Sequence, residues 1–444
     1  MPMVGVEIGI ASVLLIVLLI YTGVHVAVAL GMVSFVGVWI YRDSFDVAMN
    51  LLALATADSI SHEVFANIPL FALMGIAASE IGLGADVYRV ANQIFRRVLG
   101  GLGIATVAAN ALFASITGSS IASASVFTRI AVPEMLRFGY TRQFSVGVVA
   151  GSSVLGMLIP PSSMLIIYAI IAERSVGEMF VAGFIPGILL AVAFAAAILA
   201  MAYFTPSFVG GPTRQTRMRA DPDAPPDLNL AEIARLLAPV VALIVLVLGG
   251  IYTGWFSPEE AGAAGSAGAL LIGVLKRRLT WKGLWRVLVE TGHITAAILF
   301  LIISASMYSR MLGIAALPTL FSEWLVSMDL GLIGLMVIYV ILMVMLGTII
   351  ETASIILIVV PLFLSSVEIL GGDLVWFGIV TVIGAEIGLL TPPLGISCFT
   401  IKSTIKDPSI TLTHIFQGAF PFAVIMLLVL IAIVAFPEIS LALL

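Results

Sequence analysis

Charged residues and cysteine are scarce in this sequence. Only 10% of its 444 residues are Asp, Glu, Lys or Arg, whereas 61% are hydrophobic, and the mean hydropathy is +1.20. Because so little polar surface could not cover the core of a soluble protein of this length, the composition indicates a polytopic membrane protein. The single cysteine, Cys398, excludes an internal disulfide and a cysteine-based metal cluster.

Enzyme motifs are also missing. The four histidines are scattered without the spacing of metal ligands. No glycine-rich loop ends in Gly-Lys-Ser or Gly-Lys-Thr, which excludes ATP hydrolysis by a Walker-type site. No nucleophile stands beside a base within an apolar stretch. We therefore expect a transporter rather than an enzyme, with energy supplied by an ion gradient or a partner, and we expect no nucleic-acid partner.

Two Pro-Pro pairs, Pro160-Pro161 and Pro392-Pro393, interrupt apolar stretches that are long enough to cross a bilayer. A proline lacks a backbone N–H and clashes with the preceding turn, so a doubled proline breaks a helix and leaves carbonyl and amide groups free at membrane depth. Lipid cannot form hydrogen bonds with those groups, whereas a bound ion or solute can. The pairs therefore predict two broken helices that carry the function.

The two breaks belong to an internal repeat. The Tyr-Thr-Gly at 21–23 recurs at 252–254, a shift of 231, and the second proline pair follows the first by 232. Gly183 recurs as Gly418, a shift of 235. Matches that keep their order at a nearly constant offset indicate two copies of one structural unit.

The repeat predicts how the chain is organised. We expect a first unit over 1–205, a cytoplasmic linker over 206–235 and a second unit over 236–444. Each unit has five crossings, an odd number, so the second unit must be inverted relative to the first. The predicted crossings are 4–20, 24–40, 66–82, 143–172 and 180–205, then 236–253, 258–275, 293–312, 374–403 and 415–436, where 143–172 and 374–403 contain the breaks.

Two further pairs of segments complete the expected fold. The apolar segments 101–137 and 331–367 have polar centres, and each is too long for one crossing and too interrupted for two, so they are predicted to be re-entrant helical hairpins. Segments 44–62 and 279–291 are predicted to be interfacial helices on the membrane surface. The expected fold class is an all-α polytopic membrane protein of two inverted repeats, each with one hairpin and one Pro-Pro broken helix.

Basic residues predict the orientation of the chain. With the N-terminus outside, 17 of the 20 Lys and Arg residues fall on the cytoplasmic side, and only Arg42, Arg174 and Arg310 remain outside. Because no basic residue precedes Arg42, the first apolar run is expected to be a retained transmembrane helix rather than a cleaved signal peptide. Both termini are then periplasmic.

The hairpin tips and the proline breaks are the candidate site. Helices that end there leave free carbonyls, and helices that begin there point free N–H groups and a positive dipole end into the membrane centre. Carbonyls with hydroxyls suit Na⁺, and helix N-termini suit an anionic group of a solute. The predicted Na⁺-binding residues are Ser119, Ser120, Gly156, Pro160, Gly347, Thr348, Glu351, Gly388, Thr391, Pro392 and Gly395. The predicted solute-binding residues are Thr117, Gly118, Ser162, Ser163 and Thr352.

Alternatives stay open at these positions. Small polar residues also occur where membrane helices merely pack closely. Glu351 and Glu386 are acids within apolar runs, which by default marks a functional position, although such a carboxylate can also be paired internally. Either Ser162 or Ser163 can cap the half-helix that follows the first break.

Six short motifs carry a family resemblance. They are Asn-Ile-Pro-Leu-Phe at 67–71, Thr-Gly-Ser-Ser at 117–120, Pro-Glu-Met at 133–135, Ile-Pro-Pro-Ser at 159–162, Gly-Phe-Ile-Pro-Gly at 183–187 and Gly-Leu-Leu-Thr-Pro-Pro-Leu-Gly at 388–395. Together they resemble the large membrane subunit of tripartite ATP-independent periplasmic (TRAP) transporters, of the C4-dicarboxylate and sialic-acid uptake type. One departure is Thr117, where the family more often has Ser. Both residues carry a hydroxyl, so that group is kept.

The resemblance implies a Na⁺-driven elevator in the bacterial inner membrane, in which hairpins and broken helices slide as a transport domain against a scaffold. It also implies two partners, a small four-helix membrane subunit and a soluble periplasmic binding protein that delivers a small solute. The alternative is a stand-alone Na⁺/dicarboxylate or related anion symporter of the same hairpin architecture. The helix N-termini favour a carboxylate-bearing solute.

Overall fold

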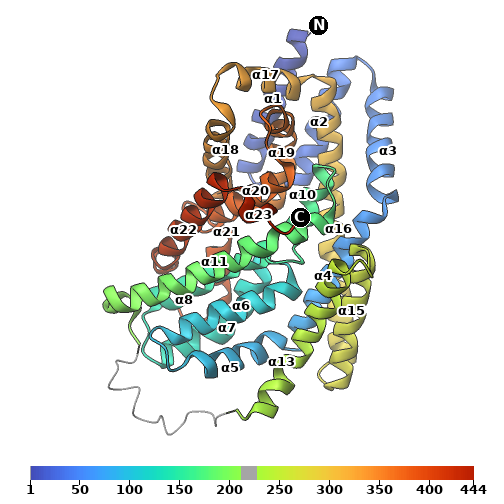
Figure 1. Cartoon of the computed structure of the whole chain (residues 1–444). Coiled ribbons are helices and arrows are strands. Elements are labelled where there is room, and N and C mark those ends of the chain that lie inside the picture. Colours follow the sequence, from blue (N-terminus) through green and yellow to red (C-terminus); the bar gives the residue numbers. More distant parts are fainter. Residues whose placement is uncertain (1, 212–227) are drawn as a thin grey trace.

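The computed structural model describes residues 2–211 and 228–444, and every regular element in those ranges is a helix (Figure 1). The first half contains α1 (Pro2–Tyr21), α2 (Val26–Arg42), α3 (Phe45–Ser61), the short turn η1 (Glu63–Ala66), α4 (Asn67–Glu80), α5 (Leu83–Phe95), α6 (Gly101–Thr117), α7 (Ser120–Arg137), α8 (Arg142–Ser153), α9 (Leu155–Leu158), α10 (Ser163–Ile171), α11 (Val176–Phe204) and α12 (Pro206–Val209). The second half contains α13 (Leu230–Ile244), the π-turn η3 (Val245–Gly249), α14 (Gly250–Tyr252), α15 (Pro258–Leu275), α16 (Trp281–Ile314), α17 (Leu317–Ser327), α18 (Gly331–Gly347), α19 (Thr352–Ile369), α20 (Leu374–Leu389), α21 (Ile396–Thr404), α22 (Leu412–Ala435) and α23 (Glu438–Leu441). The all-α prediction is confirmed for these residues.

Side-chain caps determine where many of the helices begin. Ser44 and Thr141 each accept a hydrogen bond from a backbone N–H in the first turn of α3 and α8. Asn229 and Ser257 form complete capping boxes with glutamates three residues later, at the starts of α13 and α15. Each cap satisfies N–H groups that a helix otherwise leaves unpaired, so polar residues beside apolar runs define the helix bounds.

The helices of the two halves correspond at the offset that the sequence repeat predicts. α18 begins 230 residues after α6, while α19 and α20 each begin 232 residues after α7 and α8. In Figure 1 the α6–α7 hairpin lies in the lower half of the view and the α18–α19 hairpin in the upper half. This placement is the one expected of two inverted copies.

Both hairpins and both broken helices form within a few residues of their predicted bounds. α6 and α7 meet at Gly118-Ser119, and α8 to α10 form a bent pair, Arg142–Leu158 and Ser163–Ile171, with an angle of 43° at the break. Both Pro-Pro peptide bonds are cis. Six helices of the described residues are long and apolar enough to cross a membrane, or seven if the bent pair counts as one span. The chain is therefore a multi-pass membrane protein.

The structure differs from the sequence prediction in three places. A separate interfacial helix over 279–291 does not form, because those residues are the first part of α16, a continuous helix of 34 residues. No proline interrupts α16, so at 1.5 Å per residue it runs for about 50 Å. The helices α5 and α17, which the sequence analysis did not assign, occupy matching places in the two halves. The linker predicted over 206–235 is shorter, since α13 begins at Leu230, and its centre, 212–227, lies outside the described residues.

Small residues bring several of the long helices together. A Cβ atom added at Gly31 on α2 would lie 3.2 Å from the Ser304 hydroxyl on α16, and one added at Gly265 on α15 would lie 2.5 Å from the sulfur of Met74 on α4. α3 lies beside α16, where Asp58 forms an ion pair with Arg310. Membrane helices associate through such close van der Waals contacts, so α2, α3, α4, α15 and α16 form one packed group.

A second packed group carries the hairpins and breaks. α8 and α22 touch through their backbones, because a Cβ atom added at Gly147 would lie 2.1 Å from the Gly418 carbonyl oxygen. α18 and α20 touch in the same way at Gly347 and Gly388. α7 also packs on α21, and α10 packs on α19, so each hairpin contacts the half-helix of the other repeat. The two copies therefore interlock.

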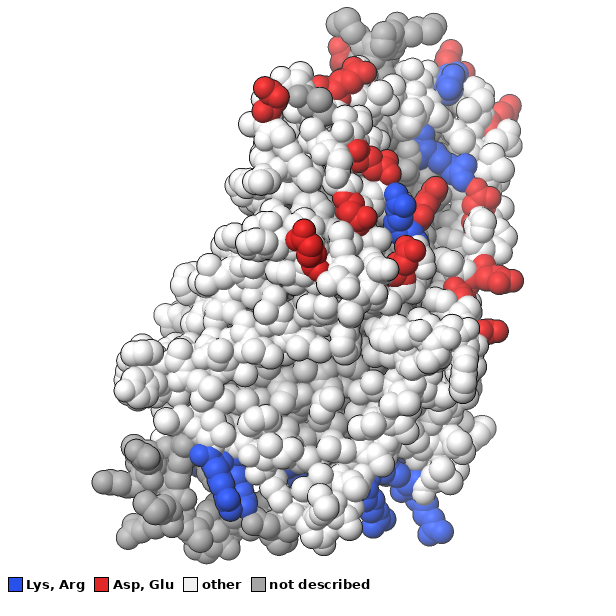
Figure 2. Space-filling view, in the orientation of Figure 1, with Lys and Arg blue, Asp and Glu red and all other residues white. Residues whose placement is uncertain are grey.

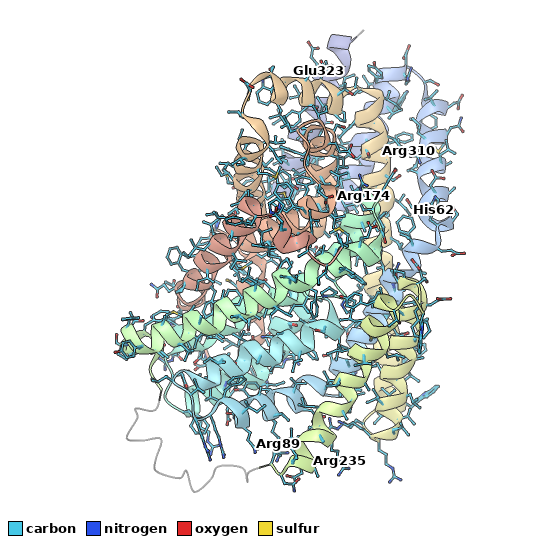
Figure 3. All side chains as sticks on the ribbon, in the orientation of Figure 1. His62, Arg89, Arg174, Arg235, Arg310 and Glu323 are labelled. Atoms are coloured by element: carbon cyan, nitrogen blue, oxygen red, sulfur yellow. The ribbon has the colours of Figure 1, made fainter. Side chains whose placement is uncertain are left out.

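Charge is segregated along the molecule. In Figure 2 the acidic side chains lie in the upper part of the view together with some basic ones, whereas the coloured side chains at the lower edge are basic, and the band between them carries neither colour. Arg89 and Arg235 lie at the lower end, whereas Arg174, Arg310 and Glu323 lie in the upper half (Figure 3). This separation agrees with the predicted division of basic residues between two sides of a membrane.

The orientation itself is testable with single cysteines, because the natural one, Cys398, is buried and replaceable by Ser. We expect Leu444→Cys to react with a membrane-impermeant maleimide in intact cells, since the C-terminus should be periplasmic. Leu230→Cys, at an 82% exposed position, should react only after permeabilisation. If the cysteine at position 444 reacted only in permeabilised cells, the C-terminus would be cytoplasmic. That result would contradict the prediction of five crossings in each repeat.

Candidate ion and solute site

The first proline break is buried within the chain. Ile159 is extended after α9, Pro160 and Pro161 are buried, and α10 begins at Ser163. The Ser162 side chain accepts a hydrogen bond from the N–H of Leu165, which resolves the alternative caps in favour of Ser162. A half-helix thus starts in the protein interior with its N-terminus at the break.

The tip of the first hairpin rests on this break. The carbonyl of Gly118 accepts hydrogen bonds from the N–H and the hydroxyl of Ser163, at 3.3 and 2.8 Å. Gly118 has a φ of +55°, and a Cβ atom there would lie 2.7 Å from the Pro161 carbonyl oxygen. Only glycine fits this conformation and this close approach. A Cβ atom added at Gly156 would lie 2.9 Å from the Ser119 carbonyl oxygen, so the tip also touches α9.

The second repeat has the same contact. The carbonyl of Thr348 accepts hydrogen bonds from the N–H groups of Leu394 and Gly395, both at 3.2 Å. Gly388 and Gly347 touch through their backbones, since a Cβ atom at Gly388 would lie 2.4 Å from the Gly347 Cα. Each hairpin tip therefore contacts the break of its own repeat.

The two breaks differ in exposure. Pro160 and Pro161 are buried, whereas Pro392 and Pro393 are exposed, as is Glu351 at the second tip. The second break therefore opens to the surface of the chain. Thr391 is half-buried, and its hydroxyl donates to the Ile387 carbonyl of its own helix.

Most of the predicted hydroxyl ligands form local hydrogen bonds. Thr117 donates to the Phe113 carbonyl, and Thr348 donates to the Met345 carbonyl. The Ser119 hydroxyl accepts from the Ala122 N–H as the cap of α7. A hydroxyl oxygen that donates in this way keeps its lone pairs, so it still has capacity to bind a cation.

Ser120 and Thr352 are placed differently from the other hydroxyls. Both are buried and both approach Glu386, and Thr352 donates to the Glu386 carboxylate over 2.9 Å. Glu386 is an acid within an apolar run, but it was not among the predicted site residues. Only the fold brings Glu386 on α20 near Ser120 and Thr352, the first residues of α7 and α19.

One further polar contact was not predicted. Asn110 on α6 donates to the Ser152 hydroxyl on α8 over 2.6 Å, and both residues are buried. The contact ties the first hairpin to the broken helix. A lone Asn within an apolar helix is the sequence signal that could have identified it, because amides join helices in membranes.

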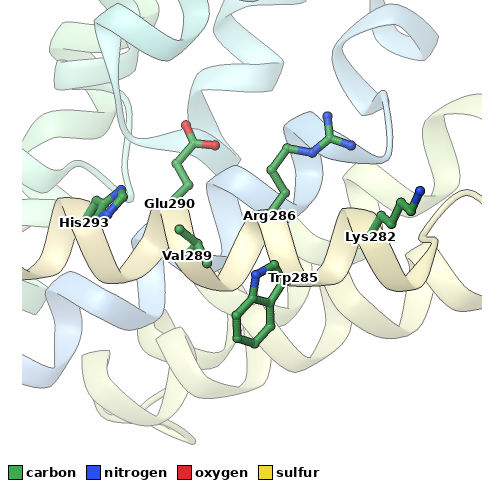
Figure 4. Close-up of a pocket in the computed structure, with 6 residues that line it drawn as sticks. All are labelled: Lys282, Trp285, Arg286, Val289, Glu290 and His293. Carbon is green, nitrogen blue, oxygen red and sulfur yellow. The ribbon is translucent and has the colours of Figure 1, made fainter.

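A shallow surface groove of about 620 Å³ lies elsewhere, on the first half of α16. Its lining residues, which all come from this one helix, are Lys282, Trp285, Arg286, Val289, Glu290 and His293 (Figure 4). Trp285 is 65% exposed and points away from Arg286. The groove is separate from the tips and breaks, so we do not include it in the site.

The chain is similar to solute transporters along nearly its whole length. It is 32% identical over 396 residues to the C4-dicarboxylate TRAP transporter large permease protein DctM of Pseudomonas aeruginosa, covering 88% of each chain. It is 29% identical over 396 residues to the sialic acid TRAP transporter large permease protein SiaM of Vibrio cholerae, covering 89% of each. Among solved structures, the YdaH transporter of Alcanivorax borkumensis shares the fold, with a TM-score of 0.60, 13% identity and 90% of each chain covered.

The family model gives the same answer as these relatives. The model of the tripartite ATP-independent periplasmic transporter, DctM component, matches residues 13–439. The match includes both hairpins and both proline breaks, which are the elements that build the site. The chain therefore belongs to the DctM family, the large permease component of TRAP transporters, and it is a transporter rather than an enzyme.

Proposed function

We propose that this permease drives the uptake of a carboxylate-bearing solute with a Na⁺ gradient, and that Na⁺ binds where each hairpin tip meets its break. The matched contacts of Gly118 and Thr348 with the two half-helices support this most strongly. Prolines cannot donate to carbonyls four residues before them, so carbonyls at 156–157 and 388–389 lack their usual helical partners. The Met157 carbonyl accepts from the Ser162 hydroxyl instead, and the Gly388 carbonyl accepts from the Thr391 N–H. Broken helices of this kind coordinate Na⁺ in secondary transporters.

The solute is proposed to bind beside the same tips. The half-helices α10 and α21 begin at the breaks, and helix N-termini attract anionic groups. Relatives are named for C4-dicarboxylates and for sialic acid, which both carry carboxylates. Ser162 and Thr352 are buried and hydrogen-bonded within the chain, so they can contact a solute only if a hairpin moves.

The proposed mechanism is an elevator with two partners. The interlocked hairpins and breaks would slide as one body against the group of α2, α3, α4, α15 and α16, because the tips and breaks are joined by hydrogen bonds within the body. A small membrane subunit would extend the scaffold, and a periplasmic binding protein would deliver the solute. The complex would lie in the bacterial inner membrane with both termini of this chain in the periplasm.

Na⁺ coupling is tested first on the purified chain, which requires no partner. We expect NaCl to raise the midpoint temperature of thermal unfolding relative to KCl or choline chloride at equal ionic strength, since a ligand that binds the folded state stabilises it. In proteoliposomes that contain the permease, its small subunit and the binding protein, succinate uptake should fall at least tenfold when K⁺ replaces Na⁺. Equal uptake and equal midpoints in the two salts would contradict Na⁺ coupling.

The same proteoliposomes separate the two types of transporter. If this chain needs its partners, vesicles that contain it alone should take up neither succinate nor sialic acid. Full uptake by the chain alone would instead favour a stand-alone anion symporter. Sialic acid serves as the second probe because it is a larger monocarboxylate, so a difference between the two rates reports the solute class.

A further inference from the structure

Glu386 is a carboxylate buried between the starts of two hairpin helices. Its side chain is 1% exposed, and it lies on α20 six residues before the second proline pair. One oxygen accepts the Thr352 hydroxyl, whereas Oε2 is buried and has no hydrogen-bond partner among the described residues. None of the ion pairs in the described part of the chain involves Glu386. A buried carboxylate without a positive partner is strongly destabilising, so this group either carries a proton or binds a cation.

Its two hydroxyl neighbours are equivalent residues of the two repeats. Ser120 is the first residue of α7, and Thr352, 232 positions later, is the first residue of α19. Ser120 is fully buried, and its hydroxyl lies near Glu386 but forms no hydrogen bond with it or with any other group in the part of the chain that is described. The position that corresponds to Glu386 in the first repeat is Val154, which is buried and apolar. One carboxylate therefore serves both hairpins.

The helix N-termini around Glu386 do not satisfy its charge. The Ala122 N–H in the first turn of α7 is already capped by the Ser119 hydroxyl. Oε2 accepts no hydrogen bond from a backbone N–H of the described residues. A bare carboxylate is therefore unfavourable here, and a bound cation is one way to balance its charge when it is ionised.

We propose that Glu386, Ser120 and Thr352 form a Na⁺ site shared by the two hairpins, in addition to the ions held at the two breaks. A carboxylate and two hydroxyls are hard oxygen ligands, and one buried carboxylate balances a monovalent ion. An ion held there joins residues from α7, α19 and α20, so it connects the two repeats directly. The site rests on the proposed Na⁺ coupling and adds a position that neither proline break contains.

The test is the number of Na⁺ ions bound by the purified full-length chain, measured by equilibrium binding of ²²Na⁺. Glu386→Gln keeps the side-chain shape and removes the charge, so we expect it to bind one ion fewer than the wild type. Glu323→Gln removes an exposed acid on α17 (Figure 3) and should bind the full number. A Glu386→Gln protein that bound as many ions as the wild type would overturn the shared site.

Two further variants decide the matter if Glu386→Gln does not fold. Thr352→Val and Ser120→Ala each remove one hydroxyl, and each should raise the Na⁺ concentration for half-saturation of one ion about tenfold. Unchanged half-saturation in both would overturn the site. A wild type that bound no Na⁺ and transported equally in K⁺ would instead refute the proposed Na⁺ coupling itself. If transport by the wild type depended on Na⁺ and the Glu386→Gln protein bound the same number of ions as the wild type, only the shared site would be refuted.

Discussion

Gly418→Ala is expected to lower the free energy of unfolding by about 3 kcal/mol or more and to abolish transport. Gly418 on α22 faces α8, and a Cβ atom there would lie 1.9 Å from the Gln143 carbonyl oxygen. Real side chains do not approach a backbone so closely, so the two helices would have to separate. Because α8 leads into the first break, their separation would move Gly156 away from the first hairpin tip.

Thermal unfolding of the purified chain and uptake by proteoliposomes measure these two effects. Gly313→Ala on α16 is the matched control, because an added Cβ atom there meets no atom within 4 Å. That variant should be as stable as the wild type or slightly more stable, since alanine has the higher helix propensity. If Gly418→Ala unfolded and transported like Gly313→Ala, the close contact of α8 with α22 would be wrong.

Asp86→Asn is expected to cost about 2 to 3 kcal/mol of stability. Asp86 on α5 is 7% exposed and accepts from Lys276 at 2.8 Å and from Arg278 at 2.7 and 3.1 Å. Its removal leaves two cations without their carboxylate at the corner between α15 and α16. The expected loss is smaller than for a fully buried pair, because the Arg278 side chain is 40% exposed and remains partly hydrated.

The same cluster should matter for transport, because α5 packs on both helices of the first hairpin. Glu368→Gln provides the comparison, since its ion pair with Arg174 has side chains that are 55% and 42% exposed. Exposed pairs contribute about 0 to 1 kcal/mol, so that variant should unfold within a few degrees of the wild type. Equal midpoint temperatures for the two variants would show that burial does not strengthen the Asp86 cluster.

Local signals explain why so much of the fold was predictable. Proline and glycine act on their own backbone, so Pro160, Pro392 and Gly118 mark breaks and a tip wherever they occur in an apolar run. Because the chain is an internal repeat, each element predicted in one half also predicted an element in the other half. The helices of both hairpins have bounds close to the predicted ones. The full length of α16 was not predicted. Its first part has the mixed apolar and charged residues of an interfacial helix, and its continuity depends only on the absence of a helix-breaking residue.

The sequence by itself determined the membrane class, the repeat, the positions of tips and breaks and the family, since these depend on composition, spacing and motifs. Only the tertiary structure decided which polar groups meet. Ser120, Thr352 and Glu386 lie on three helices up to 266 positions apart, and their meeting depends on how the inverted copies interlock. The tertiary structure also decided that the first break is buried and the second exposed, because burial depends on which helices cover each break rather than on the prolines that both contain.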